Sequence, residues 1–77
     1  MTFRPLEIVV LVRDLPEHDL REGDLGTVVE VYESKGLEVE FVTAAGKTQA
    51  LLTLSVDDVR SVIDTDLLAV RRLGRSA

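Results

Sequence analysis

The fold is decided by one stretch near the middle of the chain, LGTVVEVYESKGLEVEF, which spans Leu25–Phe41. Apolar and polar residues alternate on both sides of a turn, so the stretch predicts two strands, Leu25–Glu33 and Leu37–Phe41. The residues Ser34-Lys35-Gly36 between them predict a hairpin loop in which Gly36 takes the left-handed conformation. The stretch therefore predicts an antiparallel β-hairpin.

The same alternation assigns side chains to the two faces of this hairpin. In Leu37–Phe41 the apolar residues face inward, whereas Glu38 and Glu40 face outward. In the preceding strand the inward face holds Leu25, Thr27, Val29 and Val31, and the outward face holds Val28, Glu30 and Tyr32. Gly26 predicts a bulge or a sharp bend, which small barrels need at their corners.

Three further strands are expected around the hairpin. They cover Ile8–Arg13, Lys47–Leu54 and Val59–Ile63, where apolar residues again recur between turn signals. In the second of these strands Ala50, Leu52 and Leu54 are expected to face inward, and Leu52 is predicted to be a buried core residue with Val39 and Phe41. Before the last of them, the run Ser55-Val56-Asp57-Asp58 predicts a single helical turn capped by Ser55. For the extension over residues 64–77 two alternatives stay open, a short helix through Leu67–Leu73 or a sixth strand.

These elements together predict an all-β fold. Five short strands, tight turns and one helical turn before the last strand are typical of a small SH3-like barrel. We expect one domain over residues 1–77, with a core in residues 8–63 and a short extension after it. The alternative is an open meander that gains its second layer by dimerising.

The loop between the first two strands has an apolar residue on each side of a polar tip. Leu15 and Leu20 are expected to anchor this loop to the core. Glu17, His18 and Asp19 are then expected to lie in solvent. Pro16 ends the first strand, because it lacks a backbone donor and fixes its own φ.

Both faces of the first expected strand are apolar. Val9 and Leu11 share one face, and Val10 and Val12 share the other. A barrel of this size covers two apolar faces poorly, and an open barrel leaves edge strands without partners. The sequence therefore predicts a homodimer.

Composition limits the classes of function. The chain has 77 residues, 45% of them hydrophobic, and no cysteine, which excludes disulfides, thiolate zinc sites and thiol nucleophiles. The longest early apolar run, Ile8–Val12, is too short for a signal peptide or a membrane span. We expect a cytoplasmic protein without a membrane partner.

The net charge of −5 is distributed unevenly along the chain. Residues 1–66 hold six basic and fourteen acidic side chains, a balance of −8. Residues 67–77 hold three arginines and no acid, a balance of +3. The acidic body is expected to repel phosphate backbones, so nucleic acid is not the expected partner.

No group of residues in the sequence has the composition of an active site. His18 is the only histidine, so the chain has no second nitrogen ligand for zinc. The serines lack a nucleophile elbow, and only this one histidine could serve any of them as a base. Glu38 and Glu40 are paired carboxylates, but a small barrel can hardly form the cleft that a glycosidase needs. The sequence predicts no enzyme, no metal and no cofactor.

What remains is a surface. The candidate partner-binding residues lie on the expected outward face of the central hairpin and are Val28, Glu30, Tyr32, Glu38 and Glu40. An acidic rim around modest apolar area is typical of a protein-binding patch, although scattered surface residues give the same pattern. The expected partner is a protein with a basic surface, which the acidic body attracts and orients.

The segment Val10–Val31 resembles the opening of a small bacterial family of unknown function with the pattern D-L-P-E-x-x-L-x-x-G-D-x-G-T-V-V-x-V. The match continues through Glu38–Val42, Leu51–Leu54 and Val59–Arg60, and it covers residues 8–63. The resemblance implies a stand-alone SH3-like barrel without catalytic residues. It also implies an antitoxin or immunity role, since some members are encoded beside toxin-like or nuclease-like proteins.

The run Gly23–Val29 is also similar to small barrels of ribosome-associated proteins and transcription factors. That similarity implies binding to RNA or protein and supports the alternative function, a nucleic-acid- or ribosome-associated barrel. Fold alone does not decide between the two, because one fold hosts many functions.

Overall fold

The computed structural model describes residues 2–73, which form five strands and two short 3-10 turns. The strands are β1 (Ile8–Leu11), β2 (Leu25–Tyr32), β3 (Gly36–Val42), β4 (Thr48–Ser55) and β5 (Val59–Ser61). The turns are η1 (Pro16–His18), between β1 and β2, and η2 (Val56–Asp58), between β4 and β5. The prediction of a mainly β chain is confirmed, although β1 and β5 are each two residues shorter than expected.

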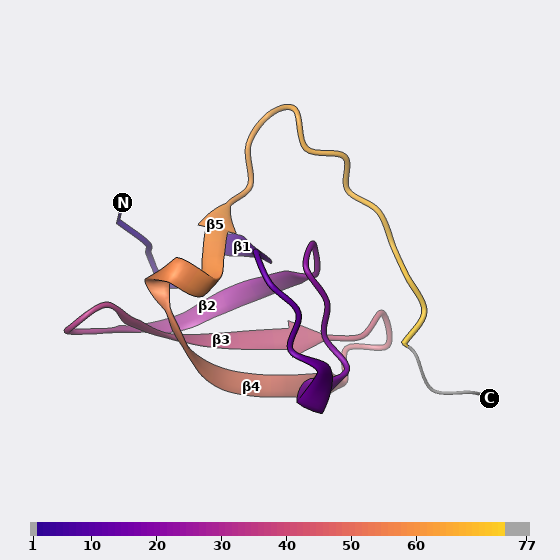
Figure 1. Ribbon diagram of the computed structural model, residues 1–77, viewed down its shortest axis with the longest axis horizontal. Coiled ribbons are helices and arrows are strands. Elements are labelled where there is room, and N and C mark those ends of the chain that lie inside the picture. The colour runs from indigo at the N-terminus through magenta and orange to yellow at the C-terminus, as the bar shows by residue number, and fades with distance from the viewer. Residues whose placement is uncertain (1, 74–77) are drawn as a thin grey trace.

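All five strands belong to one antiparallel sheet in the order β4-β3-β2-β1-β5. In Figure 1, β1 and β5 lie above the meander that β2, β3 and β4 form. Within residues 2–73 no pairing joins β4 to β5, so the sheet is open and these two strands are its edges.

The helical turn before β5 forms as predicted. The Ser55 hydroxyl accepts a hydrogen bond from the Asp57 backbone N–H, and the Asp58 carboxylate accepts one from the Ser55 N–H. This reciprocal arrangement satisfies backbone donors at the start of the turn. Arg13 donates to the same Asp58 at 2.8 Å, which ties the end of the β1 segment to the turn. That hydrogen bond is the main reason that the pKa of Asp58 is lowered.

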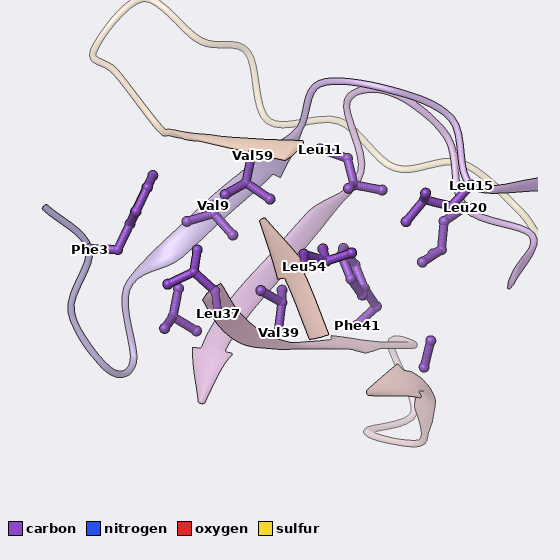
Figure 2. Close-up of a cluster of buried hydrophobic side chains, with 12 residues drawn as sticks. Phe3, Val9, Leu11, Leu15, Leu20, Leu37, Val39, Phe41, Leu54 and Val59 are labelled. Atoms are coloured by element: carbon purple, nitrogen blue, oxygen red, sulfur yellow. The ribbon is translucent and has the colours of Figure 1, made fainter. Parts of the chain in front are cut away.

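One cluster of apolar side chains fills the concave side of the sheet (Figure 2). It includes Val9, Leu37, Val39 and Phe41, which are all nearly inaccessible to solvent. Leu52 packs against the cluster but is only half-buried, so the expectation that it is a fully buried core residue is wrong. Phe3, from the segment before β1, is also buried, and the sequence had given no sign of this.

The faces of β2 differ from the prediction. A register shift between Val28 and Glu30 inserts an extra residue opposite β3, so the alternation changes phase there. Val28 pairs with Val39 and is completely buried, whereas Glu30 pairs with Glu38. The expectation that Val28 faces outward is therefore wrong, and so is the inward place given to Thr27.

Gly26 is not the site of the bulge. A side chain at this position would place its Cβ 2.6 Å from Val39 Cγ1 and 2.8 Å from Phe41 Cε2. Gly26 is needed because β2 crosses the core residues of β3 too closely for any Cβ.

The β2–β3 hairpin also turns differently from the prediction. Ser34 and Lys35 have positive φ values of 67° and 70°, while Gly36 pairs with Tyr32 as the first residue of β3. Gly36 therefore does not supply the left-handed residue. Two consecutive left-handed residues turn the chain one position earlier instead.

The long connection between β1 and β2 is anchored as expected. Leu15 and Leu20 are buried and form an isolated antiparallel bridge, and they lie together at one end of the cluster in Figure 2. Glu17 is exposed as predicted, whereas His18 and Asp19 are half-buried. Asp19 adopts a left-handed conformation, with φ of 57°, where the 3-10 turn η1 ends.

The segment after β5 forms neither the helix nor the sixth strand that the sequence left open, as far as residue 73. Arg60 clasps the Asp66 carboxylate with two hydrogen bonds of 2.9 Å, and further along Arg71 clasps Asp24 at 2.8 and 2.6 Å. These pairs fix the segment at Asp66 and at Arg71, while the stretch between them arches away from the sheet (Figure 1). Leu67 and Val70 stay in solvent, so no apolar stripe stabilises a helix.

We expect the Arg60–Asp66 clasp to make stability depend on pH. The hydrogen bond from Arg60 and the backbone N–H of Ile63 lower the pKa of Asp66 to about 2 in the folded chain. Its stabilising effect is therefore present above the unfolded-state pKa near 3.8 and is lost as the pH falls toward about 2. Asp66→Asn should lower the melting temperature at pH 7, and the difference from the parent should shrink between about pH 4 and pH 2.

Asp64→Asn is the matched control for that experiment. Asp64 lies two residues away, is exposed, and is not part of either clasp. Its substitution should leave the melting temperature nearly unchanged at both pH values. Equal melting curves for Asp66→Asn and the parent at pH 7 would show that the clasp does not stabilise the fold.

Candidate protein-interaction surface

The outward face of β2, β3 and β4 carries the acidic residues singled out in the sequence. Glu30 of β2 lies opposite Glu38 of β3, which in turn lies opposite Thr53 of β4. In the next outward row, Glu40 lies between Thr27 and Leu51. We call this set of side chains, with Tyr32, the acidic face. It is formed by alternate residues of three adjacent strands, so the sheet itself holds its members in fixed positions.

Hydroxyl groups orient two of the three carboxylates. The Tyr32 hydroxyl donates to Glu38 Oε1 at 2.7 Å, and the Thr53 hydroxyl donates to the same oxygen at 3.3 Å. The Thr48 hydroxyl donates to Glu40 Oε2 at 2.6 Å. The hydrogen bond to Glu38 also raises the pKa of Tyr32, so this phenol stays protonated and keeps donating at neutral pH.

The three salt bridges among residues 2–73 all lie away from this face. Arg13, Arg60 and Arg71 pair with Asp58, Asp66 and Asp24 respectively. Among residues 2–73, no lysine or arginine forms a salt bridge with Glu30, Glu38 or Glu40. The acidic face therefore presents like charges side by side without an internal counter-charge, which is unfavourable for folding by itself.

Four of the five residues proposed from the sequence lie together on this face, and Val28 does not. Val28 points into the core on the opposite side of the sheet, because the bulge after it reverses the alternation. The apolar contribution to the face comes instead from Leu51, which is 52% exposed, with Tyr32 and Val29 nearby in sequence or register.

The sequence analysis did not assign Leu51, Thr48 and Thr53 to this surface. A signal for two of them was present, since Ala50, Leu52 and Leu54 were assigned inward and strand alternation places Leu51 and Thr53 outward. The partnership of Thr48 with Glu40 depends on a second register shift, between Phe41 and Val42, which the pattern does not reveal.

Other kinds of site find little support in the part of the chain that the structure describes. His18 lies in η1, where its backbone carbonyl accepts a 3.3 Å hydrogen bond from the Gln49 side chain. No group of three or more histidine, aspartate or glutamate side chains within residues 2–73 is arranged to hold a metal ion. No helix in that range has the length and apolar character to cross a bilayer.

Searches of curated proteins and of solved structures each found no significant match to the chain. A family model described as "Domain of unknown function (DUF4926)" matches residues 6–61. The matched segment begins before β1 and ends with the last residue of β5, so it contains the whole sheet. The resemblance to a family of unknown function is confirmed to this extent, and the chain belongs to the DUF4926 family.

Proposed function

We propose that the chain is a non-catalytic interaction module that binds a basic protein surface through its acidic face. The observation that carries the proposal is the uneven use of counter-charges. Asp24, Asp58 and Asp66 each have an arginine partner, whereas the three glutamates of the sheet have none within residues 2–73. A lysine- or arginine-rich partner would supply that missing charge.

The geometry of the face suits binding rather than catalysis. The three carboxylates stand on adjacent strands, and none of them lines the pocket beside Tyr32 and Leu37 or the one beside Leu20 and Phe41. A catalytic carboxylate needs a site that excludes water from the reacting bond. Strand-borne side chains held by hydroxyl donors are already ordered, so a partner would lose little free energy in fixing them.

We also propose that the open sheet is an SH3-like barrel. Support comes from the long anchored loop after β1, the two hairpins β2–β3 and β3–β4, and the helical turn that leads into β5. We place the protein in the bacterial cytoplasm, a reducing compartment in keeping with a chain without cysteine.

For the partner we propose the nucleic-acid cleft of a toxin-like or nuclease-like protein, in an antitoxin or immunity complex. Such a cleft is lined by lysine and arginine side chains that neutralise phosphates. The three carboxylates of the acidic face carry negative charge, as those phosphates do, and lie on neighbouring strands. A module of this kind would block the cleft by occupying it.

The proposal predicts that neutralising the face weakens binding while the fold persists. The triple variant Glu30→Gln, Glu38→Gln, Glu40→Gln should melt at or above the parental temperature, because like charges on adjacent strands are removed. Titration with a lysine-rich peptide, followed by amide chemical shifts, should shift β2–β4 residues in the parent and lose affinity in the variant. Binding by the parent should also weaken as salt rises.

A second triple variant controls for net charge alone. Glu17→Gln, Glu22→Gln and Asp64→Asn remove the same charge from exposed loop positions. This variant should bind the peptide nearly as well as the parent. If both triple variants lose affinity equally, or if the shifts spread over the whole surface, the acidic face is ordinary solvated surface.

The alternative function, association with nucleic acid or the ribosome, depends on the basic residues after position 66. Arg71 already donates to Asp24 and to the Asp19 carbonyl, so its charge is engaged within the chain. A single-stranded oligonucleotide that binds at low salt and displaces the lysine-rich peptide would favour this alternative.

A further inference from the structure

The two edges of the sheet are protected to very different degrees. At one edge, β5 is three residues long and is followed at once by the turn in which Asp66 clasps Arg60. At the other edge, β4 is eight residues long, TQALLTLS, and contains neither a charged residue nor a proline. Soluble proteins usually protect a long edge with charges, proline or brevity, because its unpaired backbone groups attract another strand. β4 lacks all three.

The register shows which backbone groups of β4 lack a partner strand. Val56 N–H donates to the Lys35 carbonyl at 3.0 Å, one position beyond the Gly36–Ser55 pair. Because hydrogen-bonded and non-hydrogen-bonded pairs alternate along an antiparallel ladder, Leu54, Leu52 and Ala50 direct their backbone groups toward β3. Leu51 and Thr53 therefore direct their N–H and C=O groups toward the free edge.

Both ends of this free stretch are already occupied. The Ser55 N–H donates to Asp58 at 2.9 Å, and the Gln49 side chain donates to the His18 carbonyl. The open part of the edge is thus Ala50–Leu54. At its centre Leu52 points inward but is only half-buried, because the sheet ends there and no neighbouring strand covers it.

We propose that β4 pairs with β4 of a second copy of this chain, antiparallel and centred on Leu52. This register places Leu51 opposite the partner's Thr53, so the two free N–H and C=O groups of each copy bond to those of the other. It also places Ala50 opposite the partner's Leu54 and Leu52 opposite its own counterpart. The inward row is then apolar on both sides of the axis, and the two cores become continuous.

The charges near β4 and the area that a strand pair buries are both compatible with a second copy of this chain. No charged side chain lies on β4, so a two-fold axis through it sets no like charges directly opposite each other. Glu38 and Glu40 lie one strand further in, and at a strand spacing of about 4.8 Å they are separated from the partner's glutamates by roughly 14 Å, where salt screens them. A single strand pair buries less than the about 1,200 Å² of a standard interface, so the dimer should depend on concentration.

The sequence had predicted a homodimer from the two apolar faces of the first strand and from the unpaired edge strands of an open barrel. Val10, on the outer face of β1, is only 6% exposed within a single chain. Ile8 and Val12, on the same side of this segment, are 46% and 38% exposed, so that face is covered only in part. The unpaired backbone groups of β4 make it the surface that carries the inference.

A cysteine-free chain allows a direct test of the register. Leu52→Cys should form a disulfide-linked dimer under mild oxidation, since non-hydrogen-bonded antiparallel partners have Cα atoms about 4.5 Å apart, within the range that a disulfide spans. Leu51→Cys is the control. It is the more exposed position, but it would lie about 8–9 Å from its counterpart, beyond disulfide reach. Cross-linking of Leu51→Cys as readily as Leu52→Cys would overturn the register.

A second pair of variants tests the backbone bonds. Thr53→Pro removes an outward N–H that β3 does not use, and proline is tolerated at such edge positions. It should weaken the dimer by about 30-fold in sedimentation equilibrium, as expected for one lost hydrogen bond on each side of the axis. Thr53→Ala keeps the N–H and should dimerise like the parent. If Thr53→Pro does not fold, hydrogen exchange in the parent replaces this test. Pairing of the two copies should slow the exchange of the Leu51 and Thr53 amides as the protein concentration rises.

A parent chain that sediments as a monomer up to millimolar concentration would refute the proposal. So would a dimer that Thr53→Pro leaves intact in a folded variant, since the copies would then meet elsewhere. Self-association is measured without any basic partner, so its outcome is distinguishable from a failure of the acidic face to bind one.

Discussion

Phe41→Ala should leave the chain largely unfolded at physiological temperature. Phe41 is 2% exposed and packs in the cluster between the sheet and the loop anchored by Leu15 and Leu20. Removing a buried phenylalanine side chain costs about 3–5 kcal/mol. A chain of this length has a free energy of unfolding of roughly 4–12 kcal/mol. If the parent lies near the lower end of that range, the substitution removes most or all of its stability.

Circular dichroism melting of the variant and the parent measures this effect. Val42→Ala is the matched control, since Val42 is the next residue in β3 but is 55% exposed on the other face. It should melt within a few degrees of the parent. A Phe41→Ala variant that melts together with Val42→Ala would mean that the cluster does not determine stability.

Gly26→Ala should also destabilise the fold, although it adds only one methyl group. The new Cβ would lie 2.6 Å from Val39 Cγ1 and 2.8 Å from the Phe41 ring, so either the strands must separate or both side chains must move. Overpacking of this kind costs about 1–3 kcal/mol, and urea unfolding gives the value directly. Gly23→Ala is the comparison variant. Gly23 has a φ of 95°, but no atom lies within 4 Å of its Cβ position, so its substitution measures the cost of backbone strain without a steric clash.

A double variant tests whether contact with Val39 is the cause. In Gly26→Ala with Val39→Ala, the removed methyl groups make room for the added one. The combined destabilisation should be smaller than the sum of the two single effects, as expected for residues in contact. Simple additivity would place the strain at some other contact of Gly26.

Local patterns predicted the elements well because each element follows from neighbours in the sequence. The alternation from Leu37 to Phe41 gave β3 and its faces, and Ser55 followed by acids gave the capped turn. The anchoring of Leu15 and Leu20 also followed from a local pattern, two apolar residues around a polar tip.

The errors arose where distant residues decide the local structure. In β2, two adjacent valines hide the phase of the alternation, and the pairing with β3 places the bulge after Val28. The need for Gly26 comes from Val39 and Phe41, residues of another strand. The three glutamates of the surface were found because glutamates on strands rarely face a core, whereas Val28 was misplaced because valine fits either side.

The extension illustrates the same limit more strongly. Its course is set by ion pairs such as Arg71–Asp24, whose members are 47 positions apart in sequence. Burial is the largest single effect and raises the pKa of Asp24, but the hydrogen bonds from the Arg71 side chain and the Arg21 N–H, together with the charges of both arginines, outweigh it and the pKa falls. Composition shows that arginines follow residue 66 but does not show which aspartate each one meets.

The position of β1 between β2 and β5 has a consequence for synthesis of the chain. The β2–β3–β4 meander is local and can form as soon as it emerges, whereas β1 gains its second neighbour only when β5 has been made. At about 5–20 residues per second, the 47 residues between Leu11 and Val59 take roughly 2–9 seconds. Val9 and Leu11 stay incompletely covered during that interval, so we expect pulsed amide exchange to show protection in β3 before β1. A nascent chain stalled before Val59 should therefore be a better substrate for chaperones than the finished sheet.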